Sequence, residues 1–210
     1  MPEGPEVWAL SLMLNEYNLK SVSYGKHLFY NNQDWTFGLH GRVFLDPLNQ
    51  LIKVESDISG TVKDCDSIEW LVNNKNLGKD WMNSKKEEIQ MIVNEWKSMK
   101  KKLGTLLIDQ SYISGIGVAW GSEILHRCQL DPNKRAFEQN LNRLTDVIIE
   151  VRDEIKFKYT HFVMKQSSMK EAINNWYYNL YALRTITPMI NGIQVKMGGR
   201  VWWSNLKQKL

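Results

Sequence analysis

Apolar residues in the first third of the chain follow a helical spacing and then a strand-like one. Over Pro5–Asn18 they recur every three or four positions, which predicts a helix that begins just after Gly4. Residues 22–70 instead hold short apolar runs broken by turn-forming pairs such as Asn31-Asn32 and Asp46-Pro47, a pattern typical of strands. The clearest runs are His27–Tyr30, Arg42–Leu45 and Leu51–Val54.

The rest of the chain returns to helical spacing. Residues 72–83 have the composition of a linker, and Ser84 with Glu87 forms the sequence of a capping box before a predicted helix over 85–101. Apolar side chains at every third or fourth position predict a further helix over 136–157, and the alternating stretch Gln194–Trp203 predicts a β-hairpin. Two shorter helices are predicted over Thr105–Gln110 and Val118–Arg127.

This order of elements predicts an α+β protein with two modules. Residues 1–83 are expected to form an N-terminal helix with a small antiparallel β-sandwich, and residues 84–210 a helical domain that ends in the hairpin.

Composition places the chain among soluble globular proteins. Hydrophobic residues make up 43% and charged residues 24%, and no apolar run reaches the length of a membrane span. The acidic start MPEGPEV lacks the basic region of a signal peptide, so we expect an intracellular, soluble protein that does not bind membranes. Because Cys65 and Cys128 are the only cysteines, and the histidines lack metal-ligand spacing, we expect neither a structural metal nor a cofactor.

Charge is distributed unevenly between the two modules. The balance of Lys and Arg against Asp and Glu is −4 in residues 1–83 and +8 in residues 84–210. A basic second module favours a polyanionic partner, of which nucleic acid is the usual one. A solvated, lysine-rich face is an equally good interpretation of the charge by itself.

The first residues hold a candidate nucleophile. Removal of Met1 leaves Pro2 with a secondary amine, which can attack the C1′ atom of a sugar and form a cationic iminium. The adjacent Glu3 can act as a general acid on the opening sugar ring, and Pro5 suits the first turn of a helix. An ordinary lead-in to a helix is the alternative interpretation.

A second candidate site lies in the stretch LLIDQSYISGIGVAWGSEIL, residues 106–125. Two predicted helices flank a glycine-rich turn that holds Gly115 and Gly117, and backbone N–H groups at such a turn can bind phosphate. A turn of this kind more often serves helix packing alone.

Together, these motifs resemble those of the formamidopyrimidine-DNA glycosylase and endonuclease VIII (Fpg/Nei) family. MPEGPEV resembles the family's start, and LLIDQ, SGIG, SEIL and LDP resemble its helix–two-turn–helix domain in the same order. Further matches at Gly25–Leu28, Phe37–Asp46, Asn76–Asp80 and Gly198–Trp203 extend the resemblance over nearly the whole chain.

The resemblance implies a role for each matching residue. Pro2 is the nucleophile, Glu3 the general acid, Glu6 a supporting residue, and Lys26 a catalytic lysine that contacts the phosphate beside the lesion. For DNA binding, it implies Gly115 and Gly117 in the turn, Leu39 as the side chain that fills the gap left by a flipped nucleotide, and Arg200 as a phosphate ligand. A surface lysine and a core leucine are the alternatives for Lys26 and Leu39.

Residues 176–205 resemble the family's finger, but without cysteines they correspond to the zincless form, in which Trp202 and Trp203 would replace the metal by packing. Three other features depart from the family pattern. Val118 replaces an asparagine that binds phosphate, residues 57–60 lack a gap-filling arginine and phenylalanine, and the β domain is short.

The resemblance implies a monomeric, bifunctional DNA glycosylase and abasic-site lyase that removes oxidised bases from damaged DNA, duplex or single-stranded, and cuts the strand by β,δ-elimination. Two alternatives remain. One is a non-catalytic relative that only binds damaged or single-stranded DNA, and the other is a lyase that barely excises bases. The sequence does not identify the preferred lesion.

Overall fold

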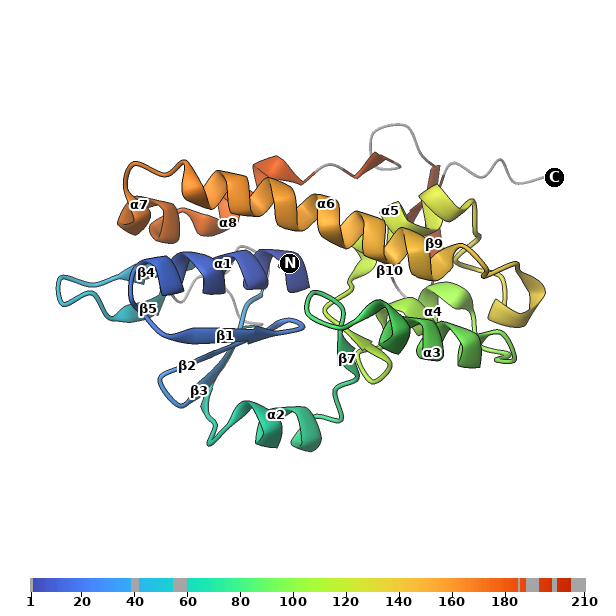
Figure 1. Ribbon diagram of the computed structural model, residues 1–210, viewed down its shortest axis with the longest axis horizontal. Coiled ribbons are helices and arrows are strands. Elements are labelled where there is room, and N and C mark those ends of the chain that lie inside the picture. Colours follow the sequence, from blue (N-terminus) through green and yellow to red (C-terminus); the bar gives the residue numbers. More distant parts are fainter. Residues whose placement is uncertain are drawn as a thin grey trace. The chain divides into compact units, whose positions relative to one another are not determined.

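The structure is a computed structural model, described here for residues 2–38, 42–54, 60–184, 186–187, 193–197 and 200–204 (Figure 1). The chain forms two compact units, each discontinuous in sequence. Unit 1 holds residues 1–77 and 154–184, and unit 2 holds residues 78–153 and 185–210. This division differs from the expected one at residue 83, because the second part of the long helix α6 (Leu144–Met164) and the two helices after it pack with the N-terminal residues.

Unit 1 begins with helix α1 (Gly4–Glu16), which confirms the helix predicted after Gly4. Pro5 and Glu6 lie in its first turn, where a missing N–H is harmless and a negative charge is favoured. The helix buries an apolar face that includes Leu10, Met13 and Leu14. It packs against the first two strands that follow it.

Four strands of unit 1 form one antiparallel sheet in the order β1-β2-β3-β6. Their bounds are Ser21–Tyr24, His27–Tyr30, Gln33–Thr36 and Val62–Asp64. Asn31 and Asn32, both with positive φ (50° and 55°), form the two-residue turn between β2 and β3, as their sequence indicated. The three strand runs singled out in the sequence are confirmed at their predicted bounds.

A second, two-stranded sheet of unit 1 pairs β4 (Arg42–Leu45) with β5 (Leu51–Val54). Among the described residues, β4 packs on helices α7 (Met169–Asn174) and α8 (Trp176–Leu183), while α1 covers β1 and β2. Each sheet is therefore covered by helix. The expected β-sandwich, in which two sheets face each other, stays a prediction.

Residues 72–83, predicted to be a linker, are ordered structure. Helix α2 (Ile68–Asn74) is capped by the Ser67 hydroxyl, and strand β7 (Lys79–Asp80) pairs in parallel with β8 (Ile113–Ser114). A side chain at Gly78 would lie 2.2 Å from the Tyr112 carbonyl oxygen, so only glycine allows this close pairing. Trp81 and Met82 are buried, but the polar residues around them give the segment the composition of a linker.

Unit 2 is mainly helical, and several of its predicted helix boundaries were wrong. The helix predicted to end at residue 101 ends at Trp96, and the one predicted to end at residue 157 continues to Met164. Helix α3 (Lys86–Trp96) is preceded by Lys85, whose N–H donates to the Glu88 carboxylate at 2.9 Å, so the cap lies one residue beyond the predicted pair Ser84 and Glu87. The helix predicted from residue 136 begins only at residue 144, after a short 3-10 turn (Ala136–Glu138). Asn140 interrupts it, because its side chain accepts the Asn142 N–H and so favours a turn.

The C-terminal hairpin is confirmed as an antiparallel pair, β9 (Ile193–Met197) and β10 (Arg200–Ser204). β10 packs on helix α5 (Val118–Cys128) within unit 2. The fully buried Trp202 ring lies against Gly121 of α5, where an added Cβ would be 3.2 Å from the ring. A small residue on α5 therefore makes room for the tryptophan that holds the hairpin.

A buried carboxylate ties the sheet of unit 1 to α2. Asp34 on β3 accepts hydrogen bonds of 2.7 Å from His27 Nδ1 and from Lys75 Nζ. Burial by itself raises the pKa of Asp34, but the hydrogen bonds and charges of His27 and Lys75 outweigh it and hold the pKa below its ordinary value of 3.8.

We expect Asp34→Asn to lower the free energy of unfolding at neutral pH by about 1–3 kcal/mol, because it leaves buried donors poorly paired. Because the folded-state pKa is lowered, the ionised group stabilises the protein above its ordinary pKa and loses that effect as the pH falls toward the folded-state pKa. Urea unfolding of both proteins as the pH is lowered through the acid range would measure this, and the two curves should converge. Equal stability at neutral pH would contradict the prediction.

Candidate active site

The start of α1 carries three of the residues predicted for catalysis. Pro2 and Glu3 are buried directly before the helix, and Glu6 is buried in its first turn. The Glu3 backbone N–H donates to Glu6 Oε2 at 2.8 Å. This bond fixes the turn on which Pro2 and Glu3 stand, so the structure brings these three residues together.

Two side chains from distant parts of unit 1 hold the Glu6 carboxylate. Tyr159 of α6 donates its hydroxyl to Glu6 Oε1 at 3.0 Å. Arg184, directly after α8, forms a two-pronged ion pair, with Nε 3.1 Å from Oε1 and Nη2 2.9 Å from Oε2. With the Glu3 N–H, both oxygens of the Glu6 carboxylate accept hydrogen bonds. These bonds compensate for the loss of water around a residue that is only 1% exposed.

The electrostatics of this cluster favour a charged arginine beside a neutral tyrosine. Burial raises the pKa of Tyr159 well above its ordinary value, and the charge of Glu6 raises it further. Burial opposes the charge of Arg184, but the nearby Glu6 and Glu3 carboxylates raise its pKa above the ordinary value. The cluster is thus an ion pair with a hydroxyl donor, and it fixes the first turn of α1.

Sequence reasoning missed Tyr159 and Arg184. Tyr159 does continue the spacing of Val151 and Ile155, so a longer predicted helix would have included it as a core residue. Arg184 gives no local signal, because its partner lies 178 positions earlier in the chain.

Lys26 lies in unit 1, in the two-residue turn between β1 and β2 rather than on a strand. Gly25 forms the other half of the turn with a φ of 57°, a conformation that glycine adopts easily. The side chain of Lys26 is half-buried. Placement at a tight turn between two strands covered by α1 gives this lysine a fixed position in unit 1.

The glycine-rich turn lies in unit 2, between α4 (Leu103–Ile108) and α5. Gly115 has a φ of 100°, and its N–H donates to the Gln110 side chain at 2.8 Å. The Gln110 amide in turn donates to the carbonyls of Ile108 and Ile116, so one side chain holds the turn closed. Gly117 is the residue before α5, and Val118 is the first of the helix.

Arg200 opens β10 opposite Met197, and its side chain is exposed. Leu39 lies outside the described residues, and so do residues 57–59 of the departing segment. The part of the chain that the structure describes contains no group of three or more His, Cys, Asp or Glu side chains placed to hold a metal ion. In the same part, no helix has both the length and the apolar character needed to cross a membrane.

Comparisons with known proteins agree with this architecture. Residues 77–172 match the family model described as the formamidopyrimidine-DNA glycosylase H2TH domain. The fold as a whole matches wild-type Lactococcus lactis Fpg (MutM) in complex with an oxidised-pyrimidine DNA, at 16% identity over 97% of both chains and a TM-score of 0.68. A mutant of that protein with Fapy-dG DNA (15%, 97% of both chains, TM-score 0.67) and MutM with carbocyclic 8-oxo-G DNA (16%, 96% of this chain and 97% of the other, TM-score 0.63) are similar too.

These findings first define the class: a mixed helix-and-sheet protein with the fold of Fpg. Residues 77–172 form a domain of the kind found in formamidopyrimidine-DNA glycosylases, which agrees with the family that the motifs of the chain resemble. No curated protein sequence gives a significant match.

Proposed function

We propose that this protein is a DNA-repair glycosylase with abasic-site lyase activity. Once Met1 is removed, the Pro2 amine attacks C1′ of the damaged nucleotide, the base leaves, and an iminium links protein and sugar. Glu3 donates a proton to the opening sugar ring. Loss of the protons at C2′ and then C4′ of the iminium expels the 3′ and 5′ phosphates in turn, which is β,δ-elimination.

One observation carries the proposal: the buried Glu6 is held by Arg184, Tyr159 and the Glu3 N–H. An ordinary helix start needs no buried ion pair, because a serine or asparagine cap suffices. A nucleophile, however, needs a fixed position relative to its sugar. Similar solved structures are complexes with DNA that contains an oxidised pyrimidine or Fapy-dG, which supports damaged DNA as the substrate class.

Trapping with borohydride on abasic-site duplex tests the proposal, because reduction of the iminium leaves a covalent protein–DNA adduct. Base release from duplexes with an oxidised pyrimidine or a ring-opened purine, measured beside strand cleavage, separates a bifunctional enzyme from a lyase alone. Absence of both adduct and base release, with purified protein that has lost Met1, would refute the catalytic proposal.

Lys26→Ala should slow adduct formation by about 10²-fold or more, because a positioned proton-transfer group contributes about that much. Lys20→Ala is the matched control, since Lys20 is an exposed lysine directly before β1. Single-turnover trapping rates measure the difference. If both variants trapped at the wild-type rate, Lys26 would have no catalytic role.

A non-catalytic DNA-binding protein is the second candidate, and Val118 favours it. At the first position of α5, valine offers no side-chain donor to a phosphate, which leaves only backbone groups there. Lesion-independent DNA binding without any trapped adduct would identify this function.

A further inference from the structure

Two segments of unit 2 pair to form a strongly basic surface that the proposed reaction does not use. Residues 99–102 run antiparallel to residues 134–137, joined by Leu103 N–H to the Lys134 carbonyl (2.9 Å), Ala136 N–H to Lys101 (3.0 Å) and Phe137 N–H to Met99 (3.3 Å). Lys102 and Arg135 are paired opposite each other. We call residues 99–102 and 134–137 the basic ribbon. Its five cationic residues are Lys100, Lys101, Lys102, Lys134 and Arg135.

Most of this charge has no ion-pair partner among the residues that the structure describes. All five side chains are exposed, and only Lys101 has an ion pair among the described residues, a 4.0 Å contact with Asp109. Lys101 also lies over the Tyr112 ring, and Lys102 contacts the neutral Asn133 amide. The nearby carboxylates of Asp131 and Glu138 accept backbone N–H groups, from Asn133 and Arg135 respectively.

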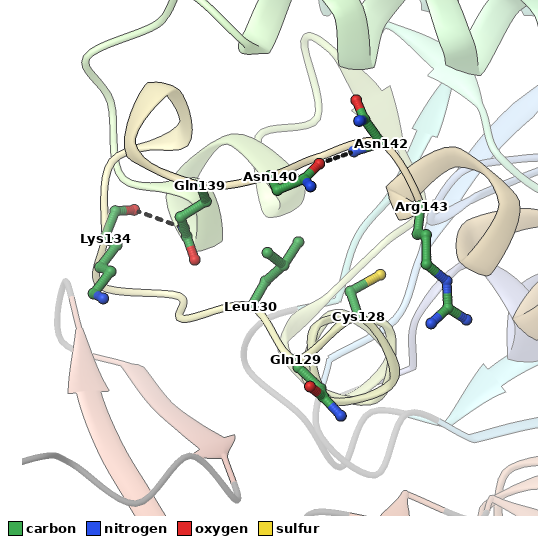
Figure 2. A pocket seen from close by; sticks show the side chains of 8 residues that line it. All are labelled: Cys128, Gln129, Leu130, Lys134, Gln139, Asn140, Asn142 and Arg143. Atoms are coloured by element: carbon green, nitrogen blue, oxygen red, sulfur yellow. Dashed lines mark hydrogen bonds between the residues drawn. The ribbon is translucent and has the colours of Figure 1, made fainter.

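A polar pocket of about 470 Å³ adjoins the ribbon at Lys134 (Figure 2). Its cations are Lys134 and Arg143, which lie at opposite ends of the view, and no carboxylate lines it. The Gln129 and Asn142 side chains form no hydrogen bond within the described structure. The full lining is Cys128, Gln129, Leu130, Lys134, Gln139, Asn140, Asn142 and Arg143. Cations and unused amides together favour an anionic ligand with polar edges.

The ribbon begins beside the first residues of the loop between α4 and α5, where Lys101 contacts Asp109 and lies over the Tyr112 ring, and the pocket lies at the far end of α5. Helix α4 begins directly after Lys102 and runs to the turn, and α5 runs back from the turn to Cys128, near the pocket. The eleven residues of α5 span about 16 Å at about 1.5 Å per residue. A short nucleic-acid contact at Gly115 and Gly117 therefore leaves the pocket end of this basic surface uncovered.

We propose that the basic ribbon and its pocket form a second binding surface for a phosphodiester backbone, which extends away from the α4–α5 turn toward the pocket. Alternate residues of an extended segment are about 6.6 Å apart, so the exposed lysines lie along the ribbon at a spacing that suits successive phosphates of one strand. The exposed Phe137 ring at its end provides a face on which a base can stack. The surface holds undamaged single-stranded or duplex DNA outside the lesion site.

The test is the salt dependence of DNA binding. The ribbon variant carries Lys100→Gln, Lys102→Gln, Lys134→Gln and Arg135→Gln. The control carries Lys20→Gln, Lys63→Gln, Lys158→Gln and Lys165→Gln, four exposed lysines of unit 1 with the same total charge change. Fluorescence anisotropy with undamaged long single-stranded and duplex DNA over a range of salt concentrations gives affinity and slope, and thermal melting confirms that both variants fold.

We expect the ribbon variant to bind long DNA at least tenfold more weakly, with a log–log salt slope smaller by about 0.7 per lost contact on single strands and about 0.9 on duplex. The strand type with the larger change identifies the preferred ligand. Trapping on a short abasic-site duplex should equal wild type in both variants, so failure of the catalytic proposal and failure of this one remain distinct. An unchanged salt slope in the ribbon variant, or an equal loss of DNA affinity in the control variant, would overturn the inference. The basic ribbon would then be better explained as a binding surface for an acidic protein.

Discussion

A chain that keeps Met1 is expected to give no borohydride-stable adduct with abasic-site DNA, whereas the same chain beginning at Pro2 gives one. With Met1 attached, the Pro2 nitrogen is part of a peptide bond and cannot attack a sugar. Loss of a nucleophile in covalent catalysis typically costs about 10³-fold or more in rate. Mass spectrometry of each preparation establishes its N-terminus, and trapping rates measure the effect.

Two controls make this result specific to the amine. The chain that keeps Met1 should bind undamaged DNA and melt as the processed chain does, which shows that the fold is intact. A processed Pro2→Gly chain retains a primary amine at the same position and should form a slower but detectable adduct. Equal trapping by the chain that keeps Met1 would mean that another residue is the nucleophile.

The largest expected effect on stability follows from removing the partner of Glu6. Arg184→Ala leaves a carboxylate that is 1% exposed without its two-pronged ion pair, and breaking a buried pair on one side costs about 3–5 kcal/mol. Urea unfolding monitored by tryptophan fluorescence measures the loss. Because the same carboxylate fixes the Glu3 N–H, trapping at temperatures where the variant is still folded should fall as well.

The double variant Arg184→Ala with Glu6→Gln is the control for this mechanism. It removes the unpaired charge, so it should recover part of the lost stability. Together with the single Glu6→Gln variant it completes the cycle that gives the coupling energy of the pair. Arg143→Ala, at an exposed arginine of unit 2, should change stability by less than about 0.5 kcal/mol. If Arg184→Ala cost no more than Arg143→Ala, the ion pair would contribute little to the fold.

Turns and helix starts could be predicted from the sequence where the residues at that position determine the backbone conformation. Asn31-Asn32 predicted the β2–β3 turn because asparagine tolerates positive φ, and Pro5 with Glu6 predicted the start of α1. The same spacing rule failed at residues 136–143. There the apolar positions match a helix, but the Asn140 side chain competes for the backbone N–H that a helix would use.

What the sequence could not provide were contacts between distant positions. The motif at the start of the chain located Pro2, Glu3 and Glu6, but the side chains that hold Glu6 come from residues 159 and 184, and no periodicity connects them. The linker prediction failed for a similar reason. Gly78 and Trp81 owe their order to residues 112–114, whose pairing with β7 is invisible in local composition.

The discontinuity of unit 1 bears on how the protein is made. A nascent chain that has emerged only to residue 153 has the whole sheet and α1, but it has neither the hydroxyl nor the guanidinium that neutralises the acidic first turn. During translation the N-terminal site must therefore wait until Arg184 leaves the ribosome. An aminopeptidase acting on the nascent chain would thus remove Met1 before the first turn of α1 is fixed by its contacts with Tyr159 and Arg184.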